Sequence, residues 1–278
     1  MPQVADITSQ PLLKTDLVEI RDVCCQGRHA QPSDEECAAA TYLVFPYRGV
    51  FVRHVGRDQA VAEANQVLFF NADESYRISH PVAGGDACLS LLVTDSILGE
   101  LAPQTVIRGD GRGFRRQRLR IDARAQALVA LLRHSLREGI AEPLEGESLA
   151  LTLARRALGP RTAHVPGASE ERRRLADRVK LILASDPARR WTLDEIAADV
   201  GRSPVYLTQV FQQVEGLPLY RYHLRLRLAR ALELLPRYDD LTSLSLDLGF
   251  SSHSHFSTAF ANAYGCPPSK FKRAASRR

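Results

Sequence analysis

The sequence has no apolar run that approaches the roughly 20 residues needed to cross a membrane. Its first residues, Met-Pro-Gln-Val-Ala-Asp, lack the basic segment and apolar core of a secretory signal. Both absences predict a cytoplasmic protein with no membrane partner. Cysteine is scarce and lacks CxxC spacing, which argues against a disulfide framework and a structural zinc site. The five are Cys24, Cys25, Cys37, Cys88 and Cys266.

Acidic residues are fewer than basic residues in the C-terminal part of the chain. The 278 residues are enough for about two domains. From Ser169 onward, 18 Lys and Arg residues face 12 Asp and Glu residues, whereas the remainder carries one net negative charge. A basic part beside a nearly neutral part fits a module that binds a polyanion such as nucleic acid. Many solvated surfaces reach the same charge, so the imbalance is only supporting evidence.

Residues 192–211 have the pattern of two short helices joined by a tight turn. Ile196 and Val200 share one helical face, and Gly201 suits a left-handed helix end. Ser203 can cap the next helix, and the proline after it fits the first helical position. The pattern predicts a helix-turn-helix, whose second helix normally enters the DNA major groove.

A similar unit follows at residues 241–265, where Gly249 lies 48 residues after Gly201 and the turn is one residue longer. Between the units, residues 219–235 predict a helix about 25 Å long that stops at Pro236. One turn of B-DNA is roughly 34 Å long, so a stiff connector can set two recognition helices in successive major-groove segments. One chain could then read a site that usually requires a dimer.

The first half of the chain has a different pattern. Residues 1–40 look polar and irregular, and short runs rich in β-branched and aromatic residues follow. Turn clusters separate these runs, which predicts a small barrel or sandwich. The expected strands are at 41–45, 50–55, 66–70, 76–79 and 87–93.

Two helices are expected after the strands, at 122–137 and 147–158, each with one apolar stripe. Such helices commonly cover a barrel, and they can also pair with a second subunit. Residues 159–169 hold two prolines and two glycines without an apolar period, which predicts a linker. The expected organisation is an N-terminal domain at 1–158, this linker, and a C-terminal domain at 170–278.

Residues 171–273 resemble the AraC/XylS family of transcriptional regulators. The residues that carry the resemblance are Arg227, Ala231, Leu234 and Leu235 in the connecting helix, Gly249-Phe250, Phe256-x-x-x-Phe260 and Gly265-x-Pro-Pro268. More weakly, Pro46-x-x-Gly49 and Ser79-His-Pro-x-x-Gly-Gly85 make the first half similar to the family's cupin-type regulatory domain.

The resemblance implies an α+β chain in which a cupin-like β-barrel with two helices is linked to an all-α domain with two helix-turn-helix units. It implies binding to double-stranded promoter DNA and regulation of transcription. RNA polymerase, a small-molecule effector and a second copy of the chain, paired through 122–158, are the further candidate partners.

Two departures from the family pattern lie in the second unit. Ser245 stands where the family usually has Ala, which predicts looser helix packing. Ala261 and Asn262 stand where basic residues are common, which predicts weaker phosphate contacts.

The outward faces of the two recognition helices predict the DNA contacts. Glutamine can pair with adenine through two hydrogen bonds, and Val or a Thr methyl group can touch the thymine methyl. The candidates are Ser203, Val205, Thr208, Gln209 and Gln212 in the first unit, and His253, Ser254, Ser257 and Thr258 in the second. Candidate phosphate contacts, which position the protein without reading sequence, are Arg202, Arg221 and Lys270.

The N-terminal domain shows no catalytic pattern. A cupin enzyme usually supplies a His-x-His pair to its metal, but His54 has Val52 at the pair position, and His80 has no histidine beside it. We therefore expect no metal, no cofactor and no enzymatic activity. A ligand cavity is the better hypothesis, although side chains of this kind are more often simple core than ligand contacts. The candidates are Tyr42, Phe51, His54, Phe70, Tyr76 and His80.

Two alternatives stay open. Cys24, Cys25 or Cys88 could make the chain a redox- or alkylation-responsive regulator, like methyl-acceptor repair proteins with this type of DNA-binding domain. The four-cysteine zinc constellation of such proteins is absent. In the second alternative, the first half is a metal-dependent cupin enzyme fused to a DNA-binding domain.

Overall fold

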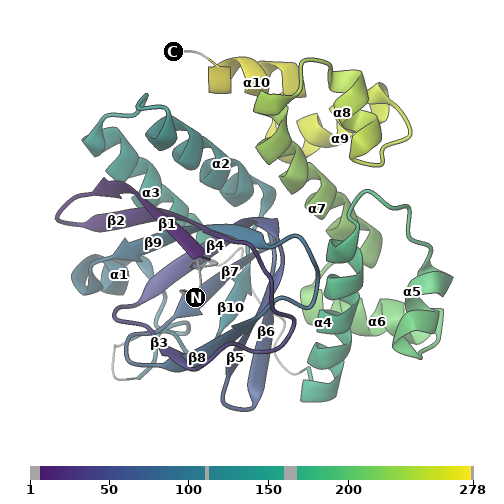
Figure 1. Ribbon diagram of the computed structural model, residues 1–278, viewed down its shortest axis with the longest axis horizontal. Coiled ribbons are helices and arrows are strands. Elements are labelled where there is room, and N and C mark those ends of the chain that lie inside the picture. The colour runs from purple at the N-terminus through teal and green to yellow at the C-terminus, as the bar shows by residue number, and fades with distance from the viewer. Residues whose placement is uncertain (1–6, 110–112, 160–167, 277–278) are drawn as a thin grey trace, which may run out of the picture. The chain divides into compact units, whose positions relative to one another are not determined.

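The computed structural model describes residues 7–109, 113–159 and 168–276 (Figure 1). The chain divides into two compact units within residues 160–167, which lie outside the described residues. Most of the linker expected at 159–169 therefore also lies outside them. Each unit has its own hydrophobic core.

The N-terminal unit is built on two antiparallel sheets, and both are labelled in Figure 1. The larger sheet has the strand order β1-β2-β9-β4-β7-β10, and the smaller has the order β3-β8-β5-β6. The strands are β1 (Ile7–Lys14), β2 (Val18–Cys25), β3 (Glu36–Cys37), β4 (Tyr42–Gly49), β5 (Phe51–Val55), β6 (Asp58–Ala62), β7 (Gln66–Phe70), β8 (Ser75–Ser79), β9 (Asp86–Val93) and β10 (Arg118–Arg120).

Side chains of the larger sheet alternate between two apolar environments, because successive residues of a strand point to opposite faces. In β4, Leu43 and Phe45 belong to the core that the helices cover, whereas Tyr42 and Val44 pack in the core shared with the smaller sheet. Both faces of β7 are covered, and all five of its residues are buried. The smaller sheet, the larger sheet and the helices therefore form three layers.

The helices of this unit are α1 (Asp95–Leu101), α2 (Ala123–Arg137) and α3 (Pro143–Leu158). The expected cap of α2 is confirmed, since the Asp122 carboxylate accepts a hydrogen bond from the Ala125 backbone N at 2.9 Å. The expected start of α3 near residue 147 is four residues late. Pro143 occupies its first turn, where a missing N–H costs nothing.

The prediction that residues 1–40 are irregular is wrong, because β1 and β2 lie there. β1 is a largely exposed edge strand that contains Pro11, so it lacks the apolar alternation of an inner strand. β2 pairs with β9 over its whole length. Val18 and Ile20 alternate with polar residues in β2, and this signal could have identified the strand.

The C-terminal unit is all helical. Its elements are α4 (Glu170–Ser185), α5 (Leu193–Val200), α6 (Pro204–Glu215), α7 (Leu219–Leu234), the 3-10 turn η2 (Leu235–Arg237), α8 (Leu241–Asp247), α9 (His253–Tyr264) and α10 (Pro268–Ser276). The two expected helix-turn-helix units are α5–α6 and α8–α9, joined by α7. Among the described helices, none combines the length and apolar character that crossing a membrane requires.

Local signals set the ends of these helices, and the predicted helix end at Gly201 and cap at Ser203 are among them. Thr192 and Glu195 form a reciprocal capping box at the start of α5, and Gly201 ends α5 with a φ of 66°. The hydroxyls of Ser203 and Ser252 cap α6 and α9. The recognition helices are therefore bounded by sequence-local signals on both sides of each turn.

Candidate functional site

The outer face of α6 presents the residues expected in the first recognition helix. Val205 keeps 68% of its surface exposed, so its methyl groups are accessible from outside the unit. Gln209 and Gln212 are exposed, and Thr208 is half-buried with its hydroxyl donating to the Pro204 carbonyl oxygen at 2.9 Å. The amide groups of the two glutamines are therefore accessible to an incoming base edge.

On the outer face of α9, some of the predicted contact residues interact with one another. His253, Ser254 and Thr258 are exposed, and Ser257 is half-buried. The Ser257 hydroxyl lies 3.2 Å from His253 Nε2, within hydrogen-bond distance. Ser254 and Thr258 are therefore the predicted contacts of this helix that present exposed hydroxyls.

The structure places the other predicted contacts on exposed positions beside the recognition helices. The hydroxyl of Ser203 is engaged as the cap of α6, accepting from the Tyr206 backbone N at 3.3 Å. Arg202 pairs with Glu171 at 3.0 Å, and Arg221 donates to the Tyr220 hydroxyl at 3.0 Å. Lys270 is exposed in the first turn of α10. Both arginines must exchange an existing partner for a phosphate, but exposed pairs of this kind are weak.

One side chain of α7 organises the segment before α5. Arg227 donates to the backbone carbonyl oxygens of Pro187 at 2.8 Å, Ala188 at 3.2 Å and Arg189 at 2.8 Å. The neighbouring His223 lies with Nε2 2.8 Å from the same Pro187 oxygen. The resemblance identified Arg227 as diagnostic, but its role as a clamp on backbone carbonyls depends on tertiary contacts.

Ser245, which stands where the family usually has Ala, is accommodated by a hydrogen bond within its own helix. Its side chain is fully buried, and its hydroxyl donates to the Thr242 carbonyl oxygen at 2.7 Å. A buried hydroxyl with a partner carries little penalty. The extra oxygen is therefore accommodated inside α8 itself.

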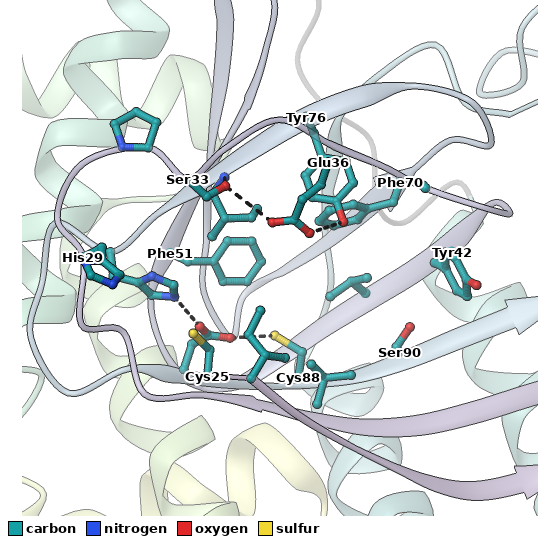
Figure 2. A pocket seen from close by; sticks show the side chains of 18 of the residues that line it. Cys25, His29, Ser33, Glu36, Tyr42, Phe51, Phe70, Tyr76, Cys88 and Ser90 are labelled. Atoms are coloured by element: carbon teal, nitrogen blue, oxygen red, sulfur yellow. Dashed lines mark hydrogen bonds and ion pairs between the residues drawn. The ribbon is translucent and has the colours of Figure 1, made fainter. Parts of the chain in front are cut away.

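A cavity of about 620 Å³ lies between the two sheets of the N-terminal unit. Five predicted ligand residues line it, namely Tyr42, Phe51, Phe70, Tyr76 and His80, and Figure 2 labels the first four. The sixth, His54, does not line it, and its Nε2 lies 2.9 Å from the Ser79 hydroxyl.

Aromatic rings form one wall of this cavity. Phe70 and Tyr76 meet edge to face with their ring centres 4.8 Å apart, and the fully buried Arg53 guanidinium stacks on Phe70 at 4.4 Å. The Tyr76 hydroxyl donates to Glu36 at 3.0 Å (Figure 2). Burial, followed by the nearby Glu36 carboxylate, raises the pKa of Tyr76, so its phenol stays neutral. This wall suits an apolar or aromatic molecule.

The opposite end of the cavity is polar. His80 Nε2 lies 2.7 Å from Asp86 Oδ1, and the Cys88 thiol donates to Asp86 Oδ2 at 3.2 Å. Burial, reinforced by Asp86, raises the pKa of the Cys88 thiol, so it remains protonated. Residues Asp86, Cys88 and those at 25–38 were absent from the predicted cavity lining. Cys25 and Val23 share the face of β2 that lines the cavity, which period-2 alternation along β2 could have indicated.

Comparison with known proteins supports the interpretation of the C-terminal unit. The family described as helix-turn-helix domain matches residues 196–274. Over 113 residues, 40% of each chain, the sequence is 29% identical to the Msm operon regulatory protein of Streptococcus mutans. Over 78 residues, it is 38% identical to the HTH-type transcriptional regulator ArgR of Pseudomonas aeruginosa, covering 28% of this chain and 24% of that one.

A third relative extends over most of the sequence. The probable transcriptional regulator LumQ of Photobacterium leiognathi is 25% identical over 238 residues, covering 84% of this chain and 92% of its own. The chain thus spans less than half the length of the other two relatives and nearly all of this one. The paired helix-turn-helix units, the matching domain and these relatives show that the C-terminal unit is a helix-turn-helix domain of the AraC type found in DNA-binding transcriptional regulators.

Proposed function

We propose that the chain reads promoter DNA with α6 and α9 together, while the N-terminal unit binds a small molecule. In this proposal, residues 170–278 are the DNA-binding domain, 159–169 the linker, and 1–158 the regulatory and dimerisation domain. The observation that carries it is the presence of two capped recognition helices with exposed polar faces in one unit.

The base-reading contacts are assigned to the exposed side chains of the two helices. Gln209 and Gln212 on α6 can each offer a paired donor and acceptor, and Val205 can touch a thymine methyl group. Thr258 and His253 are the matching groups on α9. Phosphate contacts are assigned to Arg202, Arg221 and Lys270, which lie outside the base-reading faces.

The decisive experiment is to map genomic binding sites and then footprint the full chain on one of them. Two protected segments about one helical turn apart on the same DNA face are expected. Inserting about 5 base pairs between the segments should reduce binding to that of one segment, because the two helices belong to one unit. Undiminished binding to the inserted site would show that only one helix reads the DNA.

The effector proposal is supported by the cavity between the sheets. Its volume of about 620 Å³ lies in the range of small-molecule sites, and it combines an aromatic wall with polar groups at one end. A metabolite screen should identify a compound that raises the melting temperature of the chain. The effect should be lost in Ser90→Phe, which fills the cavity, and retained in Ser96→Phe on the exposed face of α1. A screen in which no compound shifts the melting temperature would argue against an effector.

A second copy of the chain and RNA polymerase are the further proposed partners. Leu144 on α3 keeps 77% of its surface exposed, and Leu131 on α2 is also exposed. Apolar exposure on these helices supports a homodimer that pairs through 122–158. Sedimentation of the wild type against Leu144→Glu tests this proposal, which requires a dimer that the substitution weakens.

A further inference from the structure

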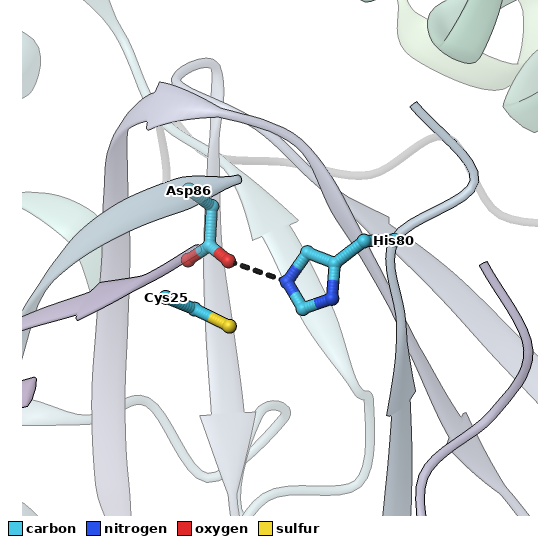
Figure 3. A group of neighbouring side chains, drawn as sticks. All are labelled: Cys25, His80 and Asp86. Carbon is cyan, nitrogen blue, oxygen red and sulfur yellow. Dashed lines mark hydrogen bonds and ion pairs between the residues drawn. The ribbon is translucent and has the colours of Figure 1, made fainter. Parts of the chain in front are cut away.

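Three potential metal ligands from separate segments meet at the polar end of the cavity (Figure 3). Cys25 is the last residue of β2, His80 follows β8 directly, and Asp86 is the first residue of β9. One ligand atom from each lies within 4.8 Å of the other two. His80 and Asp86 are buried, and Cys25 is half-buried and lines the cavity.

The three groups are held in place by hydrogen bonds with their neighbours. The Cys88 thiol occupies Asp86 Oδ2 at 3.2 Å, so Oδ1 remains directed at His80. The Gly27 backbone N–H donates to Cys25 Sγ at 3.4 Å. Hydrogen bonds to a sulfur stabilise its thiolate form, and a thiolate is the form that binds a metal. Such supporting bonds orient ligands in known metal sites.

Two glycines allow the segments that carry these ligands to approach. A Cβ at Gly27 would lie 2.6 Å from the Gly85 Cα, and a Cβ at Gly85 would lie 2.2 Å from the Cys25 carbonyl oxygen. Both glycines have positive φ, at 62° and 66°. The loop before β9 and the end of β2 are therefore in backbone contact, which fixes the spacing between the ligands.

We propose that Cys25, His80 and Asp86 bind one divalent transition-metal cation of the zinc class. Thiolate, imidazole and carboxylate together suit Zn²⁺, and three protein ligands with one open position are a common arrangement for it. One thiolate and one carboxylate neutralise the two positive charges, so the buried site carries no net charge. The remaining coordination position borders the cavity, where water or a donor atom of a bound molecule can occupy it.

The geometry requires only a small adjustment. With metal–ligand bonds of about 2.0 to 2.3 Å, tetrahedral ligands lie about 3.3 to 3.6 Å apart. The His80–Asp86 contact at 2.7 Å must therefore open by about 0.7 Å as the cation replaces the hydrogen bond. The Cys25 sulfur lies within 4.8 Å of both groups, so a shift of about 1 Å is enough to bring it to bonding position.

The sequence predicted no metal, since it offers neither a His-x-His pair nor CxxC spacing. Residue 25 is separated from residues 80 and 86 by several strands, and only the antiparallel pairing of β2 with β9 sets Cys25 opposite Asp86. This proposal requires neither DNA binding nor an organic effector. Its failure would leave the assignments to α6, α9 and the aromatic wall unchanged.

The test uses the full chain, stripped with a chelator under reducing conditions and then dialysed against Zn²⁺ or Co²⁺ alone. One equivalent of metal per chain is expected. Co²⁺ should produce a near-ultraviolet charge-transfer band that reports a bond to a thiolate. Cys25→Ser should abolish this band, whereas Cys24→Ser should retain it. Cys24 is a matched control because it is adjacent in β2 but contacts the Tyr47 hydroxyl at 3.8 Å instead of lining the cavity.

A second measurement uses the wild-type chain and needs no substitution. Zn²⁺ should slow alkylation of Cys25 by iodoacetamide at least tenfold, as mapped by peptide mass, and should leave the rate at the exposed Cys37 unchanged. Metal binding with an undiminished thiolate band in Cys25→Ser would overturn the proposal. The absence of stoichiometric binding, or equal alkylation of Cys25 with and without Zn²⁺, would overturn it as well.

Discussion

Arg227 of α7 donates a hydrogen bond from Nη1 to the backbone carbonyl oxygen of Gly249, at 3.1 Å. Gly249 lies in the turn between α8 and α9, whereas the other carbonyls bound by Arg227, those of residues 187–189, precede α5. One guanidinium therefore joins both helix-turn-helix units to the helix between them. The spacing of the two recognition helices depends on this contact as well as on the length of α7.

Replacing Arg227 by methionine should lower the unfolding free energy of the C-terminal unit by about 2 to 4 kcal/mol, because several carbonyl oxygens, most of them partly buried, lose a charged donor together. Urea unfolding followed by the fluorescence of Trp191, the single tryptophan, measures this unit specifically. Arg221→Met is the control, since Arg221 is exposed and its change should cost under about 0.5 kcal/mol. Equal costs would show that the carbonyl contacts contribute little.

The two turn glycines should differ in their tolerance of alanine. Gly201 has a φ of 66° and open space where a Cβ would lie, so Gly201→Ala should cost about 1 to 2 kcal/mol of backbone strain. Gly249 has a φ of 78°, and a Cβ there would lie 1.9 Å from the Ala188 carbonyl oxygen. Gly249→Ala should therefore cost roughly 3 kcal/mol or more in the same unfolding assay. If the two substitutions lowered the unfolding free energy by similar amounts, the close approach of Gly249 to the Ala188 carbonyl oxygen would be refuted.

The stability of the C-terminal unit should fall as the pH drops below about 6.5. Burial, and then repulsion by Arg227, lowers the pKa of His223 to about 4. Between pH 6.5 and 4 the unfolded chain binds a proton at this residue and the folded chain does not. Acidification in that window therefore favours unfolding, by about 2 kcal/mol between pH 7 and 5. Above the pKa that His223 has in the unfolded chain, none of this stability is lost.

His223→Gln is the matched variant for this pH dependence, since glutamine retains a donor for the Pro187 carbonyl oxygen but does not titrate. Its unfolding free energy should change less between pH 7 and 5 than that of the wild type. The carboxylates of Glu195 and Asp240 have pKa values lowered to about 2 by hydrogen bonds at the helix starts. The stability that they contribute is therefore lost only at more acidic pH. A wild-type slope that persists in the variant would assign the effect to another group.

Gln209→Ala should weaken binding to the cognate DNA site by roughly 1 to 3 kcal/mol and relax the base preference at one position. Thr258→Ala should cost less, because threonine lacks the paired amide contacts and because Ala261 and Asn262 beside it carry no positive charge. Titrations of both variants at one fixed salt concentration measure the ranking. A larger loss in Thr258→Ala would reverse the assignment of the principal reader to α6.

Much of the C-terminal unit could be predicted because its signals are local. Thr192, Ser203 and Ser252 cap helices a few residues away, and Gly201 needs only its own φ to end α5. Apolar residues at helical spacing then identify the buried faces of Leu207 and Phe256 without knowledge of their partners. The outward faces follow by exclusion, so the candidate DNA contacts could be named from the sequence.

The N-terminal unit was predicted less completely because its contacts are distant in sequence. The sequence pattern predicts neither β1 nor β2, since β1 is an exposed edge strand and β2 carries only a short alternation of apolar and polar residues. The aromatic residues proposed as ligand contacts reach the cavity from both sheets, because strand alternation turns them toward the space between the sheets. His54 does not line the cavity, since it lies on the opposite face of β5 from Phe51, and its Nε2 lies 2.9 Å from the Ser79 hydroxyl.

The sequence by itself indicated the two helix-turn-helix units, their outward faces and the resemblance to a family of regulators, because caps, turns and helical periodicity act over a few residues. Only the tertiary structure decided how those units are joined and what the N-terminal cavity contains. Arg227 meets Gly249 across 22 residues, and Cys25 meets Asp86 across 61 residues. Such contacts arise when a chain closes long loops to bury apolar surface, and no local pattern records which residues then become neighbours.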